Sequence, residues 1–528
     1  MEHGWLTLLP PVLAIVLALM FRQVVPALIG GIWVGAWIVH GGPAIGLIRT
    51  IDKYAVESLA DADRAKIVMF TLLLGGMVGI VSKSGGTRGL VNSLKPYATN
   101  SRRGQVVTWL LGVAIFFDDY ANTLLVGNTM RPVTDRLGVS REKLAYIVDS
   151  TAAPVASIAL VSTWIGYEVS LIGQSLEKIG NDTDPYAIFL QSLPYNFYPI
   201  LALVFGVMVA TTLRDFGPML KAERRAAGGK VLRDGAVPLA DFGSAALEPP
   251  QGKPLRWLNA AIPVGLVLLV TFLGLWLTGR ANLAESGATY EGGLQGLGAV
   301  FSAGSAYDAL MYAAFAGSAS ALLLAVAQRV LKLGEGLIAW TEGMKSMMPA
   351  MIILVLAWGI GSVCSDLKTA DFLVAQLSDS LNPAWLPAIV FLLAAVTAFA
   401  TGTSWATMSI LIPLAVPTAA GVAASAGYDA GAAHGILLGS ISSVLAGALF
   451  GDHCSPISDT TVMSSMSSGC DHVDHVRTQL PYAVTVAVVA TLVGYIPSGF
   501  GMSPWIGLVL GSAVLYGILR FVGRRASD

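Results

Sequence analysis

The chain has 528 residues, of which 12% are charged and 55% are hydrophobic, and its net charge is −1. A soluble globular protein carries about 25% charged residues, and the mean hydropathy here is +0.68, so the composition disfavours a soluble enzyme. It also excludes an intrinsically disordered chain and a nucleic-acid binder held by bulk positive charge. Apolar runs of about 17–25 residues, each long enough to cross a bilayer of ~30 Å, recur along the sequence. The sequence therefore predicts an all-α polytopic membrane protein.

The apolar runs predict about eleven transmembrane helices. We place the crossings at residues 5–21, 24–40, 66–83, 143–172, 192–213, 257–278, 307–327, 345–363, 430–470, 479–499 and 504–522. Two further apolar stretches, 104–130 and 384–417, are interrupted in the middle by polar residues. We assign these two stretches as re-entrant hairpins, which enter and leave the membrane on the same side.

The distribution of lysine and arginine predicts the orientation. Segments 84–103 and 131–143 each hold four of these residues, whereas loops 173–191 and 279–306 hold one each. By the positive-inside rule the two basic segments lie in the cytoplasm, which requires that 104–130 returns to the side from which it enters. We therefore expect the N-terminus outside, the C-terminus inside, and a location in the cytoplasmic membrane of a prokaryote.

One long hydrophilic insert, 214–256, divides the chain into a first half, 1–213, and a second half, 257–528. The insert is rich in Ala, Gly and Pro and has no apolar periodicity, which predicts a flexible cytoplasmic linker.

Three motifs of the first half recur in the same order in the second half. The matched stretches are 72–83 with 354–365, 118–123 with 403–408, and 149–157 with 451–459. The loop charges give the runs 66–83 and 345–363 opposite directions across the membrane, so we interpret the halves as an inverted repeat. Inverted repeats with broken helices are typical of secondary transporters, whose binding site lies near the midplane between the halves.

The middle of the first hairpin carries two adjacent carboxylates, Asp118 and Asp119, between aromatic residues. Carboxylates in an apolar run are costly, and two neighbours are both ionised cheaply only beside a cation. Asn122 and Thr123 add neutral oxygens that suit a hard cation such as sodium. The alternative is a solvated loop at the membrane surface.

The run 143–172 contains Asp149, Ser150 and Thr151 just before Pro154. Proline removes a backbone donor and breaks a helix, and the freed carbonyls, hydroxyls and carboxylate can coordinate a cation. The alternative is an ordinary proline kink whose hydroxyls satisfy the backbone. Glu168 in the same run is a further acid, either buried or at the outer interface.

In the second half the hairpin is neutral and the helix break carries the charge. The hairpin offers the hydroxyls of Thr403, Ser404 and Thr407 after Gly402. At the break, acids and hydroxyls surround Pro456, namely Asp452, His453, Ser455, Ser458, Asp459, Thr460 and Thr461. The two acids are either a proton-titrating pair or cation ligands. His453 either tunes the response to pH, because it titrates near neutrality, or serves as a packing residue.

A second polar cluster follows this break. It comprises Cys470, Asp471, His472, Asp474 and His475. Zinc is one interpretation, but the spacing is not that of usual zinc sites. A solvated acidic mouth of the ion path is favoured.

Three of these segments, 116–135, 149–166 and 451–483, together resemble the NhaC-type sodium/proton antiporter family. The resemblance extends over most of the chain, from about residue 5 to residue 500. The wider ion transporter superfamily implies an inverted repeat with two re-entrant hairpins and two broken helices. It also implies a homodimer in which the hairpins and broken helices move like an elevator against a scaffold.

The same resemblance implies one sodium site in each half, at a hairpin tip beside a broken helix. One site would use 118–123 with 149–154, and the other 402–407 with 452–459. This sequence departs from the superfamily's anion symporters at Asp118, Asp119 and Asp452, where those proteins carry neutral residues. The additional carboxylates favour exchange of a cation for protons.

The sequence therefore predicts a secondary transporter that exchanges Na⁺ or Li⁺ for H⁺. The predicted transport and sodium-binding acids are Asp118, Asp119, Asp149, Asp452 and Asp459, with Asn122 as a further sodium ligand. The alternative is a sodium- or proton-coupled transporter of a small organic solute, such as an amino acid or a carboxylate. A channel and an enzyme are disfavoured. We expect no cofactor beyond the transported ions, no nucleic-acid partner, and contact with the lipid bilayer.

Overall fold

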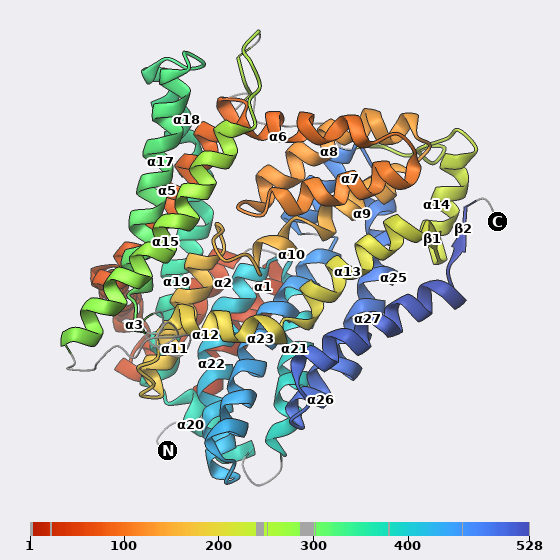
Figure 1. The fold of residues 1–528 in the computed structure, drawn as a ribbon. Coiled ribbons are helices and arrows are strands. Elements are labelled where there is room, and N and C mark those ends of the chain that lie inside the picture. The colour runs from red at the N-terminus through yellow and green to blue at the C-terminus, as the bar shows by residue number, and fades with distance from the viewer. Residues whose placement is uncertain are drawn as a thin grey trace.

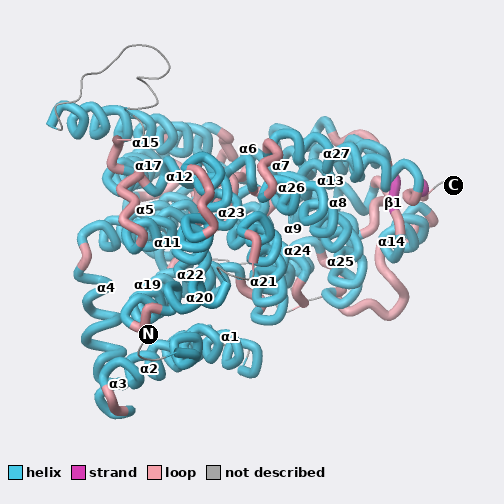
Figure 2. Tube along the Cα trace, turned by 90° about the horizontal axis from the view of Figure 1, so that it is seen from below, coloured by secondary structure: helices cyan, strands magenta, loops and turns pink. Residues whose placement is uncertain are grey.

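The computed structural model describes residues 4–21, 24–238, 248–250, 252–285, 300, 303–377, 381–456 and 458–526. Within these residues the fold is helical apart from one antiparallel ribbon of two short strands, β1 (Arg214–Asp215) and β2 (Arg524–Arg525). Figure 1 and Figure 2 show this ribbon at the edge of the molecule, beside the C-terminus.

The helices of the first half are α1 (Leu9–Phe21), α2 (Val24–His40), α3 (Pro43–Arg49), α4 (Glu57–Ala60), α5 (Ala62–Lys83), α6 (Gly86–Leu94), α7 (Ser101–Ala114), α8 (Asp119–Arg136), α9 (Arg141–Ser150), α10 (Ala153–Ala156), α11 (Ile165–Lys178), α12 (Pro185–Ser192) and α13 (Phe197–Thr212). They are followed by α14 (Gly217–Ala227), α15 (Leu258–Glu285), α17 (Ala306–Ala327), α18 (Leu333–Ser346), α19 (Met348–Asp366), α20 (Thr369–Leu377), α21 (Leu386–Thr401), α22 (Ser404–Ser425), α23 (Ala430–Cys454), α24 (Asp459–Ser468), α25 (His472–Val489), α26 (Ile496–Gly499) and α27 (Pro504–Phe521).

Seven helices among the described residues are long and apolar enough to cross a membrane, or nine if each of two bent helix pairs counts as one span. These helices make the chain a multi-pass membrane protein. The expected number of eleven crossings stays a prediction, because run 143–172 is broken and runs 5–21 and 345–363 form shorter apolar helices. Helix α22 extends eight residues past the predicted hairpin boundary at 417 and is itself long enough to span.

Helix α15 illustrates how these sequences divide between lipid and protein. Val267, Thr271 and Leu275 are buried, and they recur every four residues on one face. Leu269 and Leu273, also four apart, are at least half exposed. Because the exposed stripe is apolar, it suits hydrocarbon rather than water, while the buried stripe packs against neighbouring helices.

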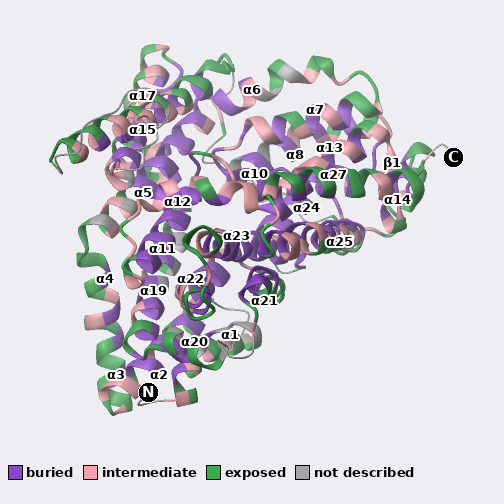
Figure 3. Cartoon of the chain, turned by 60° about the horizontal axis from the view of Figure 1, so that its bottom comes forward, coloured by how far each residue is buried: buried purple, intermediate pink, exposed green. Residues whose placement is uncertain are grey.

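Small residues set the distance between helices. A Cβ on Gly79 of α5 would lie 2.2 Å from the carbonyl oxygen of Ala339, and one on Gly343 of α18 would lie 2.2 Å from that of Gly75. Glycine at these positions therefore permits the close backbone approach that joins helices without a hydrophobic driving force. Helices α5, α15, α17 and α18 form one packed group, which Figure 1 shows along one side of the molecule. Figure 3 shows many buried residues in α11, α22, α23 and α24.

The predicted flexible linker is ordered over 214–238, so this part of the prediction is wrong. Met219, Ala222 and Ala226 form a buried stripe on α14, and this helix is too short for its periodicity to be noticed within a polar insert. The buried Glu223 accepts a hydrogen bond of 2.8 Å from the backbone nitrogen of Ser140. Residues 239–247 lie outside the described part of the chain.

A buried ion pair joins α9 to the ordered part of the insert. The Lys143 ammonium contacts Asp215, and both side chains are almost completely buried. The Tyr482 hydroxyl donates a hydrogen bond of 2.5 Å to the same carboxylate. A buried charge without its partner is costly. The pair between Lys143 and Asp215 therefore keeps the insert attached to the transmembrane helices.

We expect Lys143→Met to destabilise the protein because it leaves the Asp215 carboxylate buried without its cation. Breaking one partner of a buried pair costs about 3–5 kcal/mol, which thermal unfolding of the purified protein in detergent would report as a lower melting temperature. The double variant Lys143→Met/Asp215→Asn should recover most of this loss. An unchanged melting temperature in the single variant would contradict the assignment.

Candidate functional site

The tip of the first hairpin touches the first helix break. Helices α7 and α8 meet at a turn over 115–118, and α9 ends at Ser150 before the short helix α10. The Asn122 amide nitrogen donates to the carbonyl oxygens of Gly112 and Thr151, each at 2.7 Å. Gly112 permits this approach, because a Cβ there would lie 1.9 Å from the Thr151 hydroxyl. Asn122 thus joins both hairpin arms to a carbonyl at the break.

The two adjacent acids of this tip are buried. Asp118 is 2% exposed and Asp119 is 3% exposed, so the segment is not a solvated loop. The indole nitrogen of Trp164 donates to the Asp119 carboxylate at 3.0 Å, and the backbone nitrogen of Thr163 donates to the carbonyl of Phe117 at 3.0 Å. The chain that follows the first break therefore returns to the hairpin tip and holds Asp119.

The tip of the second hairpin touches the second helix break in a corresponding way. Helices α21 and α22 meet at Gly402, whose φ of 70° is a left-handed conformation that favours glycine. The Ser404 hydroxyl donates to the Asp452 carboxylate at 3.1 Å. The Ser455 hydroxyl donates to the carbonyl of Phe399 at 2.7 Å. Asp452, which is 2% exposed, thus lies in the last turn of α23 and contacts the start of α22.

The two hairpin tips are connected through aromatic side chains. The rings of Trp164 and Trp405 lie 5.6 Å apart between centroids, and those of Tyr167 and Trp405 lie 4.3 Å apart. The Tyr167 hydroxyl donates to the backbone carbonyl of Trp405. Because Trp164 holds Asp119 and Trp405 follows Ser404, the acids of the two halves belong to one connected region.

In each half, the helix that follows the break packs against the hairpin of the other half. Helix α11, which follows the first break, packs on α22, and α24, which follows the second break, packs on α8. At the latter contact a Cβ on Gly127 would lie 2.1 Å from the Ser467 hydroxyl oxygen. This exchange of helices brings the hairpins and breaks of both halves together in one unit.

The Asp149 carboxylate has its described partners on α25. Gln479 donates to it at 2.6 Å, and a ring nitrogen of His475 lies 3.9 Å from the same oxygen. Gln479 also donates to the backbone carbonyl of His453. The first break therefore contributes its Thr151 carbonyl to the hairpin, while the Asp149 side chain extends to a helix of the second half.

The remaining hydroxyls at the breaks satisfy backbone groups or one another. Thr151 donates to the carbonyl of Ile147 at 2.8 Å, which is the bond expected of a kinked helix. Thr407 donates to the carbonyl of Thr403 at 3.0 Å. The Ser458 hydroxyl lies 2.9 Å from that of Thr460 and caps α24. The side chains of Ser150, Ser455, Ser458 and Thr461 are buried too, whereas that of Asp459 lies outside the described part of the structure.

His453 is a buried residue with one ring nitrogen in use. Its Nδ1 lies 2.7 Å from the hydroxyl of Tyr198 on α13. Its Nε2 is buried and has no hydrogen-bond partner among the described residues. His453 therefore packs against Tyr198, and its role in the response to pH stays a prediction.

Several buried oxygens on the first half have no donor among the described residues. Among them are Asn122 Oδ1, Thr123 Oγ1, Thr163 Oγ1 and both carboxylate oxygens of Glu168. Buried polar atoms are nearly always satisfied, and oxygens of these types are the ligands of hard cations. Glu168 is 1% exposed, so of its two sequence alternatives the structure places it in the interior.

The cluster after the second break makes structural contacts. The Asp471 carboxylate caps α25, and although burial opposes this, backbone hydrogen bonds from Val237, Asp474 and Val473 hold its pKa below the usual value. Asp474 pairs with Arg233 of the insert at 2.8 Å. His472 and His475 each place Nδ1 within 2.9 Å of the Ser465 hydroxyl. Among the described residues no three such side chains are grouped as a metal would require.

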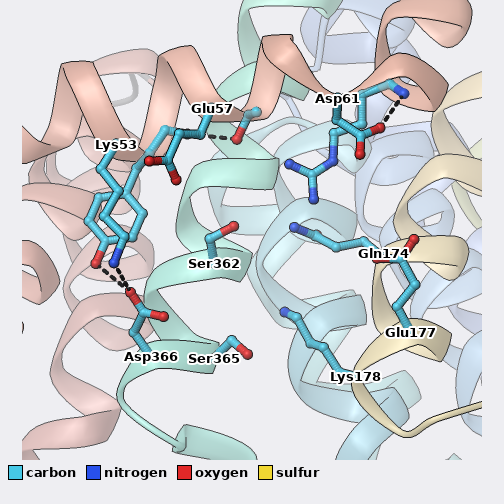
Figure 4. A pocket seen from close by; sticks show the side chains of 12 residues that line it. Lys53, Glu57, Asp61, Gln174, Glu177, Lys178, Ser362, Ser365 and Asp366 are labelled. Carbon is cyan, nitrogen blue, oxygen red and sulfur yellow. Dashed lines mark hydrogen bonds and ion pairs between the residues drawn. The ribbon is translucent and has the colours of Figure 1, made fainter.

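A separate polar pocket of about 380 Å³ lies at the far end of α11. Figure 4 shows Lys178, Ser362 and Ser365 facing the same space, with Lys53 joined to Asp366 at its edge. Helix α11 begins beside Trp164 and ends at Lys178. At 1.5 Å per residue this helix is about 20 Å long, so it links the hairpin tips to the pocket.

The model of the Na⁺/H⁺ antiporter family matches residues 155–500, which include the second hairpin and the second break. The chain belongs to the Na⁺/H⁺ antiporter family. Family membership makes it a secondary transporter and not an enzyme.

Curated relatives of this antiporter-family chain include three from bacteria. It is 34% identical over 531 residues to an uncharacterized protein of Haemophilus influenzae, covering 98% of this chain and 95% of that protein. It is 30% identical over 167 residues to an uncharacterized Na⁺/H⁺ antiporter of the same organism, covering 30% of this chain and 32% of the relative. It is 30% identical over 166 residues to the malate-2H⁺/Na⁺-lactate antiporter of Bacillus subtilis, covering 30% and 33%.

Two solved transporter structures share the fold. The YdaH transporter of Alcanivorax borkumensis has a TM-score of 0.53 at 16% identity, over 87% of this chain and 90% of that chain. MtrF of Neisseria gonorrhoeae has a TM-score of 0.51 at 12% identity, over 90% and 84%. At these identities the likeness concerns the fold alone.

We expect Asn122→Leu to lower stability, since Leu has a similar volume but donates no hydrogen bond. The carbonyls of Gly112 and Thr151 would lose a buried donor, which costs about 1–3 kcal/mol for an unsatisfied group. Thermal unfolding in detergent measures this change. Thr211→Val, which removes a hydroxyl at an exposed position on α13, is the matched control and should melt close to wild type. Equal melting of the two variants would contradict a bridging role for Asn122.

Proposed function

We propose that this transporter exchanges Na⁺ or Li⁺ for H⁺ across the cytoplasmic membrane of a prokaryote. The observation that supports this most is the pair of buried acids where a hairpin tip meets a helix break, Asp119 at the first tip and Asp452 at the second break. A buried carboxylate is costly unless a proton or a cation neutralises it. Because either ligand serves, sodium and protons compete for the same groups, and this competition couples the two fluxes.

The groups around the acids differ between the two halves, and we assign the acids different roles on that basis. Near Asp118 and Asp119 in the chain, the side-chain oxygens of Asn122 and Thr123 have no donor among the described residues, so a dehydrated sodium ion could serve as their partner. Asp149 is held by the Gln479 amide, which suits a group that exchanges protons. Asp452, with Ser404, supplies the corresponding acid of the second half, and Asp459 at the start of α24 is a further acid there.

The reciprocal packing of α11 on α22 and of α24 on α8 supports an inverted repeat whose two hairpins move together. We propose that this unit moves as an elevator against a scaffold that includes α5, α15, α17 and α18. The N-terminus would lie outside and the C-terminus inside, and the resemblance to the superfamily favours a homodimer.

The test is a pH-gradient dye in proteoliposomes. The liposomes are acidified inside, and NaCl, LiCl, KCl or choline chloride is then added outside. We expect Na⁺ or Li⁺ to restore fluorescence, because entering cation drives protons out, and choline to have no effect. Purified, monodisperse protein that gives no response to any cation would overturn the proposal.

A second candidate is a sodium- or proton-coupled transporter of a small organic solute. The polar pocket in Figure 4 favours it, because its lysines, acids and serines offer both donors and acceptors to a zwitterion or carboxylate. Among the relatives, one is named for malate and lactate exchange and another is an arginine/ornithine antiporter of Halobacterium salinarum, 32% identical over 148 residues. Uptake of a panel of labelled amino acids and carboxylates into the same proteoliposomes separates the candidates. Full cation exchange without any solute would count against this second candidate.

A further inference from the structure

A basic pocket of about 510 Å³ lies apart from the hairpin tips, where the chain ends. Four of its eight lining residues are arginines, Arg102, Arg214, Arg520 and Arg525, and none is acidic. They come from the start of α7, from the two strands and from the last turn of α27. A side chain set of this kind is complementary to an anion, and guanidinium groups bind phosphate oxygens in paired hydrogen bonds.

The fold holds this positive charge together. In the small ribbon Arg214 of β1 lies opposite Arg525 of β2, and like charges directly opposite one another destabilise a sheet. Arg214 is fixed in place, since its guanidinium donates to the carbonyls of Gly523 at 2.7 Å and Arg520 at 3.2 Å. Because the accepting carbonyls are neutral, these hydrogen bonds do not neutralise the positive charge of Arg214. The neighbouring Asp215 is engaged by Lys143 and Tyr482.

The pocket lies at the ends of two helices that belong to candidate membrane spans. Thr212 ends α13 and Arg520 lies in the last turn of α27, and both helices belong to candidate membrane spans. Next to the pocket, Phe521 and Val522 are 88% and 60% exposed, so an apolar surface continues from its rim. Tyr516 also lines the pocket, and tyrosine is typical of the membrane–water interface. Figure 1 shows the end of α27 running into this ribbon.

We propose that this pocket binds the phosphate headgroup of an anionic phospholipid, whose acyl chains lie along the exposed side of α27. Basic pockets between transmembrane helices on the cytoplasmic side are suited to such headgroups, and the basic loops predict that this side is cytoplasmic. A free phosphate would use the same arginines but would gain nothing from the apolar rim. The lipid therefore satisfies both features of the site.

The experiment measures thermal stability of the purified full chain in detergent with added phosphatidylglycerol, phosphatidylcholine or inorganic phosphate. The pocket variant is Arg102→Gln/Arg525→Gln, which leaves the backbone hydrogen bonds of Arg214 intact. The matched control is Arg103→Gln/Arg524→Gln, which removes the same charge from adjacent residues that do not line the pocket. A second readout is the amount of phosphatidylglycerol retained after purification, determined by lipid mass spectrometry.

We expect phosphatidylglycerol, but not phosphatidylcholine, to raise the melting temperature of the wild type and of the control. The pocket variant should bind it about 30-fold more weakly, which corresponds to about 1 kcal/mol for each arginine removed. Equal stabilisation by inorganic phosphate would overturn the lipid assignment. Equal loss in the pocket variant and the control would also overturn it, since it would show a diffuse effect of surface charge. Neither readout depends on cation exchange, so the result is independent of the proposed transport activity.

Discussion

Asp452→Asn should abolish sodium-dependent proton movement in proteoliposomes. The amide keeps the size of the side chain and can still accept the hydrogen bond from Ser404, which lies 3.1 Å from the carboxylate in the wild type. It cannot titrate, however, and it offers no charge to a cation. Loss of one partner of a buried charge interaction costs about 2–5 kcal/mol, so sodium binding should weaken by about 30-fold or more.

Dye dequenching on addition of NaCl measures this loss, at matched protein content in the liposomes. Asp182→Asn is the control, because Asp182 is an exposed acid in the loop after α11 and its substitution changes the formal charge by the same amount. We expect the control to exchange at the wild-type rate. Wild-type exchange by Asp452→Asn would remove the second hairpin from the transport site.

Asp119→Asn should have a similarly large effect for the first half. The side chain accepts the Trp164 indole hydrogen bond at 3.0 Å, and an asparagine oxygen can accept it too, so the contact with the aromatic bridge survives. The substitution therefore removes charge and titration while preserving the fold. We expect exchange to fall by about 30-fold or more, on the same 2–5 kcal/mol basis.

Trp164→Phe separates the carboxylate from the contact that holds it. It removes the indole donor but leaves an aromatic ring against Trp405, so we expect a smaller loss of exchange than in Asp119→Asn. The melting temperatures of both variants report whether the fold is intact. Equal activity of Asp119→Asn and wild type, with both proteins folded, would contradict the role of this acid.

The acids of the site could be predicted from the sequence because charges in apolar runs are rare. Asp118, Asp119 and Asp452 stand out for this reason, and each is buried at a hairpin tip or a helix break. The partners of Asp149 could not be predicted in this way. Gln479 lies 330 residues further along the chain, so only tertiary packing brings the two together. His475 and Gln479 are four residues apart and so form a polar pair on one face of α25. This pair is the feature of the sequence that could have indicated a partner for a buried acid.

The aromatic contacts of the site also could not be predicted from the sequence. Trp164 and Trp405 resemble ordinary interfacial or core residues in a membrane sequence, and nothing local indicates that their rings meet. Their contact depends on the exchange of helices between the halves. The ordered insert was missed for a related reason, since the pair between Lys143 and Asp215 stabilises a segment whose own composition predicts flexibility.

The most direct test of the account is uptake of radioactive sodium into proteoliposomes under an imposed pH gradient, with no organic solute present. With the interior acidic, outward proton flow should drive sodium to a higher concentration inside than outside, and collapse of the gradient by a protonophore should release it. Asp452→Asn should show neither effect. Sodium uptake that does not depend on the pH gradient would contradict proton-coupled exchange through these carboxylates. Uptake that appears only when an organic solute is added would contradict it too.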